Sequence, residues 1–240
     1  MHASGGFQPN HRDNFDLMIR AAIFDLDGTL VDSNELHVRS WQETFRNFGK
    51  EFPVEALRKQ IGKGADQYLP EFLDEEEIRT HGKEIEEFRS RLFKKEYLPK
   101  VKGFSKVREL FERIKADGKR IALASSGGGE EVRVYKKLTD IEDLVDEEIS
   151  GDDIEKTKPH PDLFDAALER LNECSHRDVI VVGDTPYDAQ AAAKAKIEMI
   201  GVLCGGFDER TLCENGAIAI YRDPADLLSQ YSDSPLVSAN

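Results

Sequence analysis

Two carboxylates stand two residues apart near the start of the chain, where Asp25 and Asp27 follow a short apolar run and precede Gly28. At the end of a strand, both side chains can face one crevice, and glycine gives the backbone the freedom to turn. With average residue usage, the pattern D-x-D-G-T occurs by chance at only about 10⁻⁵ of positions. We therefore interpret the pair as part of a reactive site and not as an ordinary acidic turn.

A second acidic pair, Asp184 and Asp188, follows the apolar run that ends at Val182. If the strands before Asp25 and Asp184 are neighbours, two acidic strand ends face each other and repel. A hard divalent cation with oxygen ligands relieves that repulsion. Two simpler interpretations remain open: Asp184 as the N-cap of the helix that follows it, and Asp188 as a solvated carboxylate in the first turn of that helix.

Two further segments have side chains that suit a bound phosphate group. Ser125 and Ser126 end another apolar run and precede three glycines and a helix, whose free backbone N–H groups favour an anion. Lys158 precedes a proline and is therefore held extended, which lets its ammonium point into the crevice and neutralise phosphate charge. Taken singly, the serines also fit cap and loop chemistry, and the lysine also fits the surface.

These residues are positioned by a predicted α/β fold, in which short apolar runs alternate with helical patterns. Continuous apolar runs fit strands that are buried on both faces of a doubly wound parallel sheet. Two helices have clear apolar stripes, one through Val107 and Ile114 and one through Phe164 and Leu171. The strands are predicted at residues 21–24, 120–124, 145–149, 179–182, 199–203 and 217–220.

The alternation is interrupted between residues 34 and 98, where two helical stripes and no strand are predicted. An insertion at the carboxyl end of a strand lies over the active-site edge of a sheet, so we predict an all-helical cap. The predicted organisation is a loose tail over residues 1–17, a catalytic core over 18–33 and 100–240, and the cap over 34–99.

The composition narrows the class of protein. The formal net charge of −14 argues against nucleic acid or an anionic membrane as a partner, because both need a basic face. No apolar run approaches the roughly 20 residues that span a bilayer, and we expect no signal peptide. The three cysteines form no C-x-x-C pair and fit reduced thiols in a cytoplasmic protein. An anionic substrate would need local positive charge from a bound cation and from lysines.

Taken together and in this order, the motifs resemble those of the haloacid dehalogenase superfamily over residues 19–228. The cap after the first strand is similar to that of the phosphoglycolate phosphatase and β-phosphoglucomutase branch. The resemblance implies a Rossmann-like core with a helical cap, and an enzyme that hydrolyses a small phosphate monoester such as a sugar phosphate or phosphoglycolate. Asp27 favours phosphoryl transfer over dehalogenation, because the dehalogenases of the superfamily lack an acid at that position.

The resemblance also implies roles for the acidic residues. Asp25 would attack phosphorus and form an aspartyl-phosphate, while Asp27 would protonate the leaving oxygen and then activate water. Mg²⁺ would be held by the Asp25 carboxylate, the Asp27 backbone carbonyl and Asp184, in a site that Asp188 orients.

The remaining motif residues would bind the phosphoryl group. Ser125 and backbone amides near Asp27 and Ser126, with Gly28 among them, would hold its oxygens. Lys158 would shield Asp25 from the incoming dianion.

The cap is expected to choose the substrate. His37 resembles a mutase histidine that helps to position the general acid and the sugar phosphate, and it equally fits a packing role in its helix. Mutases also carry a cap arginine that binds a second phosphate, and this chain has Ala65 there. The nearby Lys63 is the candidate substitute as a cap contact to the substrate, although a lysine cannot give bidentate contacts. We therefore expect a phosphatase, with a phosphomutase as the alternative and an inert binding protein as a less favoured one. A phosphonoacetaldehyde hydrolase would need a cap lysine for a Schiff base, for which Lys63 is the candidate.

Overall fold

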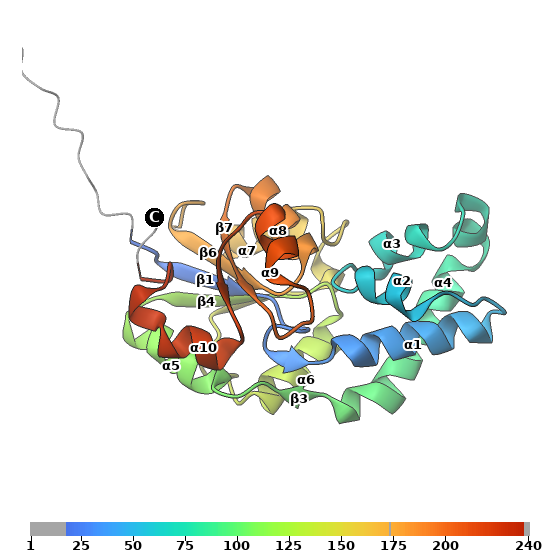
Figure 1. The fold of residues 1–240 in the computed structure, drawn as a ribbon, viewed down its shortest axis with the longest axis horizontal. Coiled ribbons are helices and arrows are strands. Elements are labelled where there is room, and N and C mark those ends of the chain that lie inside the picture. Colours follow the sequence, from blue (N-terminus) through green and yellow to red (C-terminus); the bar gives the residue numbers. More distant parts are fainter. Residues whose placement is uncertain (1–17, 173, 238–240) are drawn as a thin grey trace, which may run out of the picture.

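A six-stranded parallel sheet in the order β5-β4-β1-β6-β7-β8 forms the centre of the molecule (Figure 1). The structure is a computed structural model and describes residues 18–172 and 174–237, so the predicted tail over residues 1–17 lies outside it. All six predicted strands are confirmed, and the third begins two residues later than expected. The strands are β1 (Ala21–Phe24), β4 (Arg120–Ala124), β5 (Glu147–Ile149), β6 (Val179–Gly183), β7 (Glu198–Val202) and β8 (Ala217–Tyr221).

Helices cover both faces of the sheet, as its apolar strands require. Ala22 and Phe24 of β1 pack into one buried cluster, while Ala21 and Ile23 pack into another. The first cluster takes side chains from α5, α6 and α10, and the second from α7 and α8. These helices are α5 (Val107–Ala116), α6 (Gly129–Leu138), α7 (Asp162–Arg170), α8 (Pro186–Ala195) and α10 (Pro224–Ser229), with α9 (Glu209–Glu214) and 3₁₀ turns at Gly151–Asp153 and Tyr231–Asp233 beside them. No helix in residues 18–172 and 174–237 combines the length and the apolar character that crossing a membrane requires.

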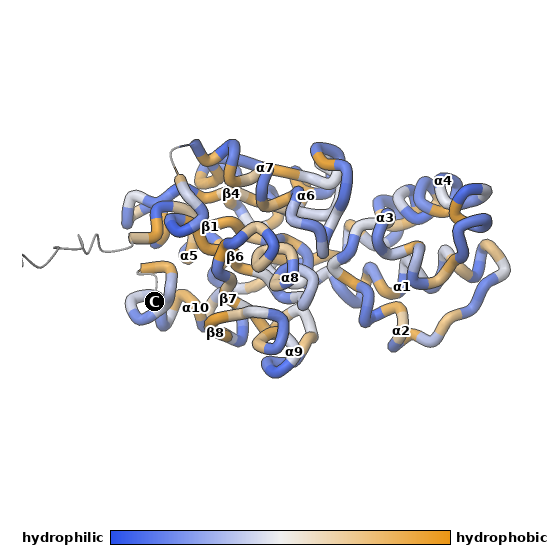
Figure 2. The backbone as a smooth tube through the Cα atoms, turned by 90° about the horizontal axis from the view of Figure 1, so that it is seen from above, coloured by the Kyte–Doolittle hydropathy of each residue, from blue (hydrophilic) through white to orange (hydrophobic). Residues whose placement is uncertain are grey.

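The segment between β1 and β4 folds into a helical lobe that stands apart from the sheet (Figure 2). Its two predicted helices are confirmed, and two shorter ones join them. The lobe has its own apolar core, in which Trp41 of α1 stacks on Tyr68 with ring centroids 4.4 Å apart. The Asp74 side chain caps the long helix α4 by accepting from the backbone of Glu77 at 2.9 Å. The elements are α1 (Asn34–Asn47), α2 (Val54–Lys59), α3 (Ala65–Tyr68), α4 (Glu75–Leu92), a π-helical turn at Phe93–Tyr97 and 3₁₀ turns at Leu69–Glu71 and Leu98–Lys100.

A small antiparallel ladder, which the sequence did not predict, lies where the chain leaves and re-enters the core. Strand β2 (Val31–Asp32) pairs with β3 (Lys102–Gly103), and the Phe104 N–H donates to the Leu30 carbonyl at 2.9 Å. Strands of two residues are too short to show an alternating pattern. The ladder joins the two connections of the lobe side by side, close to the predicted boundaries at residues 33 and 100, which stay predictions.

Candidate active site

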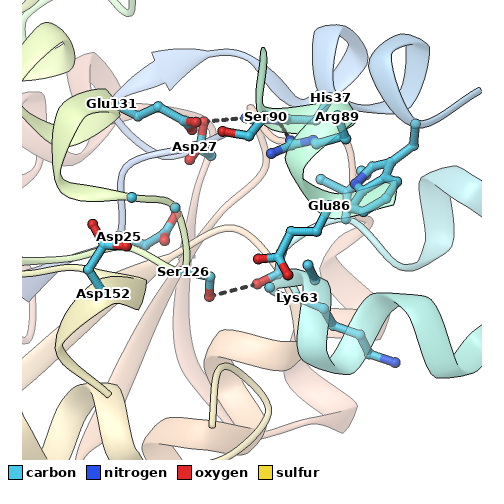
Figure 3. A pocket seen from close by; sticks show the side chains of 17 residues that line it. Asp25, Asp27, His37, Lys63, Glu86, Arg89, Ser90, Ser126, Glu131 and Asp152 are labelled. Atoms are coloured by element: carbon cyan, nitrogen blue, oxygen red, sulfur yellow. Dashed lines mark hydrogen bonds and ion pairs between the residues drawn. The ribbon is translucent and has the colours of Figure 1, made fainter. Parts of the chain in front are cut away.

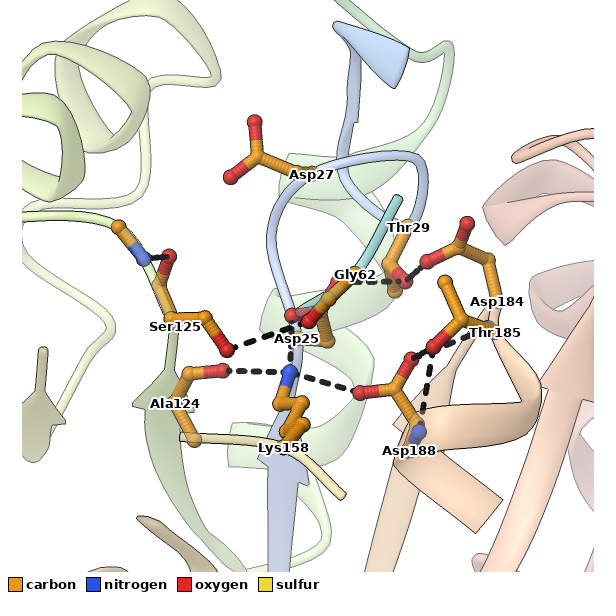
Figure 4. Close-up of polar contacts among 12 residues, drawn as sticks. Asp25, Asp27, Thr29, Gly62, Ala124, Ser125, Lys158, Asp184, Thr185 and Asp188 are labelled. Atoms are coloured by element: carbon orange, nitrogen blue, oxygen red, sulfur yellow. Dashed lines mark hydrogen bonds and ion pairs between the residues drawn. The ribbon is translucent and has the colours of Figure 1, made fainter. Parts of the chain in front are cut away.

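Three neighbouring strands end at the candidate site. Strand β1 lies between β4 and β6, so Asp25, Ser125 and Asp184, which each follow one of these strands, come together at one edge of the sheet (Figure 4). The Asp25 N–H donates to the Val182 carbonyl at 2.9 Å and extends the ladder to the site. The prediction that the strands before Asp25 and Asp184 are neighbours is confirmed.

Lys158 lies at the centre of this edge and is only 1% exposed, so the surface interpretation of this lysine is wrong. Its Nζ lies 2.5 Å from Oδ1 of Asp25, 2.6 Å from Oδ1 of Asp188 and 3.4 Å from the Ala124 carbonyl. Burial disfavours the ammonium, but the attraction of Asp188 and Asp25 outweighs burial and raises the lysine pKa. The side chain is therefore a fixed positive charge beside Asp25.

Asp188 connects this charge to the helix that follows β6. Its Oδ2 accepts from the Thr185 backbone at 3.0 Å, and the Asp188 N–H donates to Oγ1 of Thr185 at 3.1 Å. Thr185, not Asp184, is the N-cap of α8. Asp188 is buried, so the interpretation of a solvated first-turn carboxylate is wrong.

Asp25, Asp184 and Asp188 form a buried acidic cluster whose ligand oxygens lie within 4.8 Å of one another. Burial raises the pKa of Asp25 to about 7 against the attraction of Lys158, and burial and the neighbouring Asp25 raise that of Asp184. Three carboxylates and one ammonium leave a formal charge of −2 when all are ionised. A divalent cation with oxygen ligands matches both that charge and that donor set.

Asp27 points away from the cluster and toward the helical lobe. Its Oδ1 lies 2.7 Å from Nε2 of His37 and accepts from Ser33 at 2.6 Å. Burial alone would raise the pKa of Asp27, but the attraction of His37 and the hydrogen bonds from His37 and Ser33 lower it to about 2. The His37 ring also stacks on Phe93, 4.0 Å away, so it packs and hydrogen-bonds at once.

The predicted phosphate-binding residues lie around Asp25. Oγ of Ser125 accepts from the Gly127 N–H at 3.0 Å, and Ser126 donates to the Gly62 carbonyl of the lobe at 3.2 Å. Gly28 has φ +79°, and a Cβ there would lie 2.3 Å from Oδ2 of Asp184, so only glycine fits.

A cavity of about 180 Å³ opens over Asp25 and Asp27, with walls from both the core and the lobe (Figure 3). This is more than ten times the volume that one water molecule needs, and it suits a small organic phosphate. Lys63 lines the cavity, but its ammonium turns outward and donates to Glu71 and Gln60, at 2.6 Å each.

Four charged wall residues were missed by sequence reasoning, namely Glu86, Arg89, Glu131 and Asp152. On the sequence, Glu131 resembles any acid in the first turn of a helix, and Arg89 resembles a basic residue of a helix end. The pattern gives no signal for them, because their shared cavity exists only after the lobe folds back over the sheet.

A model of the haloacid dehalogenase-like hydrolases matches residues 22–202. The chain belongs to this family. The Thermotoga maritima phosphorylated carbohydrates phosphatase is 30% identical over 88% of this hydrolase and 97% of its own length. The Nitrosospira multiformis phosphoglycolate phosphatase is 29% identical over 86% and 93%. A hydrolase structure from Pseudomonas syringae superposes with a TM-score of 0.78 and 27% identity, over 89% of this chain and 97% of its own.

The family and the branch that the motifs indicated are thus confirmed, and the helical lobe is the cap of this hydrolase. The start of helix α3 in the cap is bound to the core next to the site. Asp66 accepts from the Thr157 backbone at 3.0 Å and from the Thr157 hydroxyl at 2.5 Å, and the Gly64 N–H donates to that hydroxyl at 2.9 Å. Thr157 directly precedes Lys158, so the contact couples the cap to the lysine beside Asp25.

Replacing Asp66 with Ala is expected to loosen the cap and raise KM about tenfold, with a smaller change in kcat. Two hydrogen bonds to a carboxylate are lost, and each such bond has a net worth of about 1.5–3 kcal/mol. Steady-state kinetics and small-angle scattering would measure the effect. Glu84→Gln, an exposed acid elsewhere on the cap, is the matched control. An unchanged KM together with an unchanged scattering profile would count against the coupling.

Without metal, the melting temperature of this hydrolase is expected to fall as pH rises from about 5 to 8. The pKa of Asp25 is 3.8 in the unfolded chain and about 7 in the folded protein, so protonation of Asp25 favours the folded state. This stabilisation is fully present below pH 3.8 and is lost as the pH rises through 7. Mg²⁺ at 100 times its Kd should restore about 5–10 °C at pH 8 and less at pH 5, where protons compete. Thermal denaturation in EDTA and in MgCl₂ checks this, with Asp184→Asn as the control that weakens the effect. An equal gain at both pH values would contradict it.

Proposed function

We propose that this hydrolase is a Mg²⁺-dependent phosphatase of small phosphate monoesters, sugar phosphates or phosphoglycolate-like compounds. The observation that carries the proposal is the placement of Asp25, which touches Lys158, belongs to the buried acidic cluster and lines the cavity. This arrangement presents a carboxylate nucleophile, a fixed cation and a divalent metal site to one phosphate group. The names of the curated relatives support the same reaction class.

In the proposed first step, an Oδ atom of Asp25 attacks phosphorus and the bond from phosphorus to the leaving oxygen breaks. Asp27 gives that oxygen its proton. His37 and Ser33 contact one oxygen of Asp27, which holds the carboxyl group in place. The low pKa of Asp27 suits the second step best, in which it takes a proton from the water that attacks the aspartyl-phosphate. Asp25 is then regenerated and phosphate leaves.

The other residues hold charge and position. Lys158 would offset the negative charge that builds up between Asp25 and the phosphoryl group, and Ser125, Ser126 and the amides around Gly28 would bind phosphoryl oxygens. Asp25, Asp184 and the Asp27 carbonyl would hold Mg²⁺, while Asp188 keeps Lys158 and the start of α8 in place. The metal, when bound, supplies positive charge against which the phosphoryl oxygens are oriented.

A phosphomutase is less well supported. A mutase must bind a second phosphate in the cap, for which Lys63 was the candidate. The ammonium of Lys63 is already engaged by Glu71 and Gln60. The same engagement disfavours a Schiff base at Lys63. An inert binding protein would have no need for the buried charge of Lys158 beside Asp25.

The test is phosphate release from a panel of phosphate esters, in MgCl₂ and in EDTA, by the unaltered protein. The panel includes β-glucose 1-phosphate with and without a bisphosphate primer. Metal-dependent release supports the proposal. Isomerisation without net release would replace it with the mutase, and no turnover of any ester would overturn both.

A further inference from the structure

Two polar atoms in the cavity wall have no hydrogen-bond partner within the described parts of the chain. They are Oε2 of Glu131 and Nε of Arg89, and both are fully buried. Both residues line the cavity beside Asp27 (Figure 3). Buried polar atoms in proteins are almost always paired, and leaving one unpaired costs free energy. A group that enters the cavity is therefore expected to satisfy them.

Glu131 lies in the first turn of α6, directly after the loop that carries Ser125 and Ser126. Its side chain is 3% exposed, and no ion pair joins it to another residue in the described structure. Burial raises its pKa, with the positive charge of Arg89 acting in the opposite direction. In Figure 3 the carboxyl group of Glu131 lies next to that of Asp27. It is thus placed beside the oxygen that Asp27 would protonate.

Arg89 of α4 belongs to the part of the cavity wall that the cap provides. Its guanidinium lies over the Trp41 ring at 5.2 Å and over the Phe93 ring at 4.9 Å, and one terminal nitrogen contacts Nδ1 of His37. Within residues 18–172 and 174–237, it forms no ion pair with a carboxylate. These contacts leave its Nε–H without an acceptor in the part of the chain that the structure describes.

We propose that Glu131 and Arg89 form a subsite for a neutral hydroxyl group on the leaving group, next to the ester oxygen. A hydroxyl can accept from Nε–H of Arg89 and donate to Oε2 of Glu131 at the same time. It suits the carboxyl in either protonation state, because a hydroxyl is both donor and acceptor. The inference rests on the proposed phosphatase function and narrows its substrates to esters of polyols and sugars.

The charge of the walls disfavours an anionic leaving group. Besides Asp25 and Asp27, the acids Glu86, Glu131 and Asp152 line the cavity, and the ammonium of Lys63 is turned away from it. Acids therefore outnumber Arg89 in the lining. A carboxylate next to the ester would be repelled by Glu131 whenever that side chain is ionised. Phosphoglycolate should therefore be a poor substrate.

The experiment compares three esters of nearly equal size: 2-hydroxyethyl phosphate, ethyl phosphate and phosphoglycolate. For the unaltered protein, kcat/KM for 2-hydroxyethyl phosphate is expected to exceed that of the other two about tenfold or more. Glu131→Ala should bring the ratio to ethyl phosphate close to one, and Glu131→Gln, which keeps an amide oxygen, should restore part of it. Glu130→Ala is the matched control, since Glu130 stands in the same helical turn but pairs with Lys94 on the surface.

A ratio near one in the unaltered protein, a preference for phosphoglycolate, or a ratio that Glu131→Ala leaves intact would overturn the subsite. Melting temperatures of the variants distinguish a lost preference for 2-hydroxyethyl phosphate from a lost fold. If Glu131→Ala does not fold, the ratio of kcat/KM values is measured with Glu131→Gln instead. p-Nitrophenyl phosphate is included as a reference ester without a hydroxyl. If the unaltered protein hydrolyses none of the four esters, the phosphatase function itself falls, which is a result distinct from equal rates on all of them.

Discussion

Asp25→Asn is expected to lower phosphate release by at least about 10⁴-fold, because an amide cannot attack phosphorus and losses of this size follow removal of a nucleophile. The fold should survive the change. Asn has nearly the same shape, it removes one of three mutually repelling carboxylates, and Lys158 keeps its partner Asp188 at 2.6 Å. Phosphate release under saturating Mg²⁺, together with a melting curve, measures both effects.

The matched control for this variant is Asp32→Asn, which changes an exposed acid in the neighbouring strand β2. It should leave turnover within about twofold, as surface substitutions usually do. Turnover of Asp25→Asn within tenfold of the unaltered protein would remove Asp25 as the nucleophile. A large fall in its melting temperature would show instead that the carboxylate is needed for the fold.

Lys158→Met is expected to damage both stability and turnover. Removing the lysine leaves Asp25 and Asp188 buried without their counter-charge, and breaking a buried ion pair from one side costs about 3–5 kcal/mol. Turnover should fall at least about 10²-fold, because the charge opposite the phosphoryl group is lost. Urea unfolding at pH 7.5 and pH 5 measures the first effect, and phosphate release measures the second.

The loss of stability should be larger at pH 7.5 than at pH 5. The pKa of Asp25, already about 7, rises further without Lys158, so at pH 5 the carboxyl is neutral and needs no partner. Lys156→Met, an exposed lysine two residues earlier, is the control and should unfold like the unaltered protein. A free energy of unfolding within about 1 kcal/mol of the control at both pH values would show that the buried pairs contribute little.

The sheet and the floor of the site could be predicted because both depend on local sequence. Apolar runs of four or five residues that alternate with helical patterns are typical of buried parallel strands, and residues after adjacent parallel strands meet at one edge. Asp25, Ser125 and Asp184 follow from that rule alone. Lys158 was placed by its motif, although its burial between two carboxylates could be seen only in the structure.

The cavity walls could not be predicted in the same way. Glu131 and Arg89 belong to different lobes, and their role depends on how the cap lies over the core, which no local pattern records. The direction of the Lys63 side chain depends on Gln60 and on Glu71, which lies eight residues away beyond helix α3. Asp27 was expected to act as an acid, and its lowered pKa was not foreseen. The pKa is lowered by His37, which lies in helix α1 of the cap, and by Ser33, which directly precedes that helix.

The pairing of β2 with β3 has a consequence for how such a protein can change over evolutionary time. Both ends of the cap meet at one ladder beside the sheet, and the cap carries its own apolar core around Trp41. The inserted segment therefore behaves as a closed loop on the core. The distance between its two ends is fixed by the ladder and does not depend on the length of the segment. The entropy of closing a loop grows only slowly with length. One cap can therefore be exchanged for another of different size without disturbing the strands that hold Asp25, so the selectivity of the cavity can diverge while the chemistry at its floor stays the same.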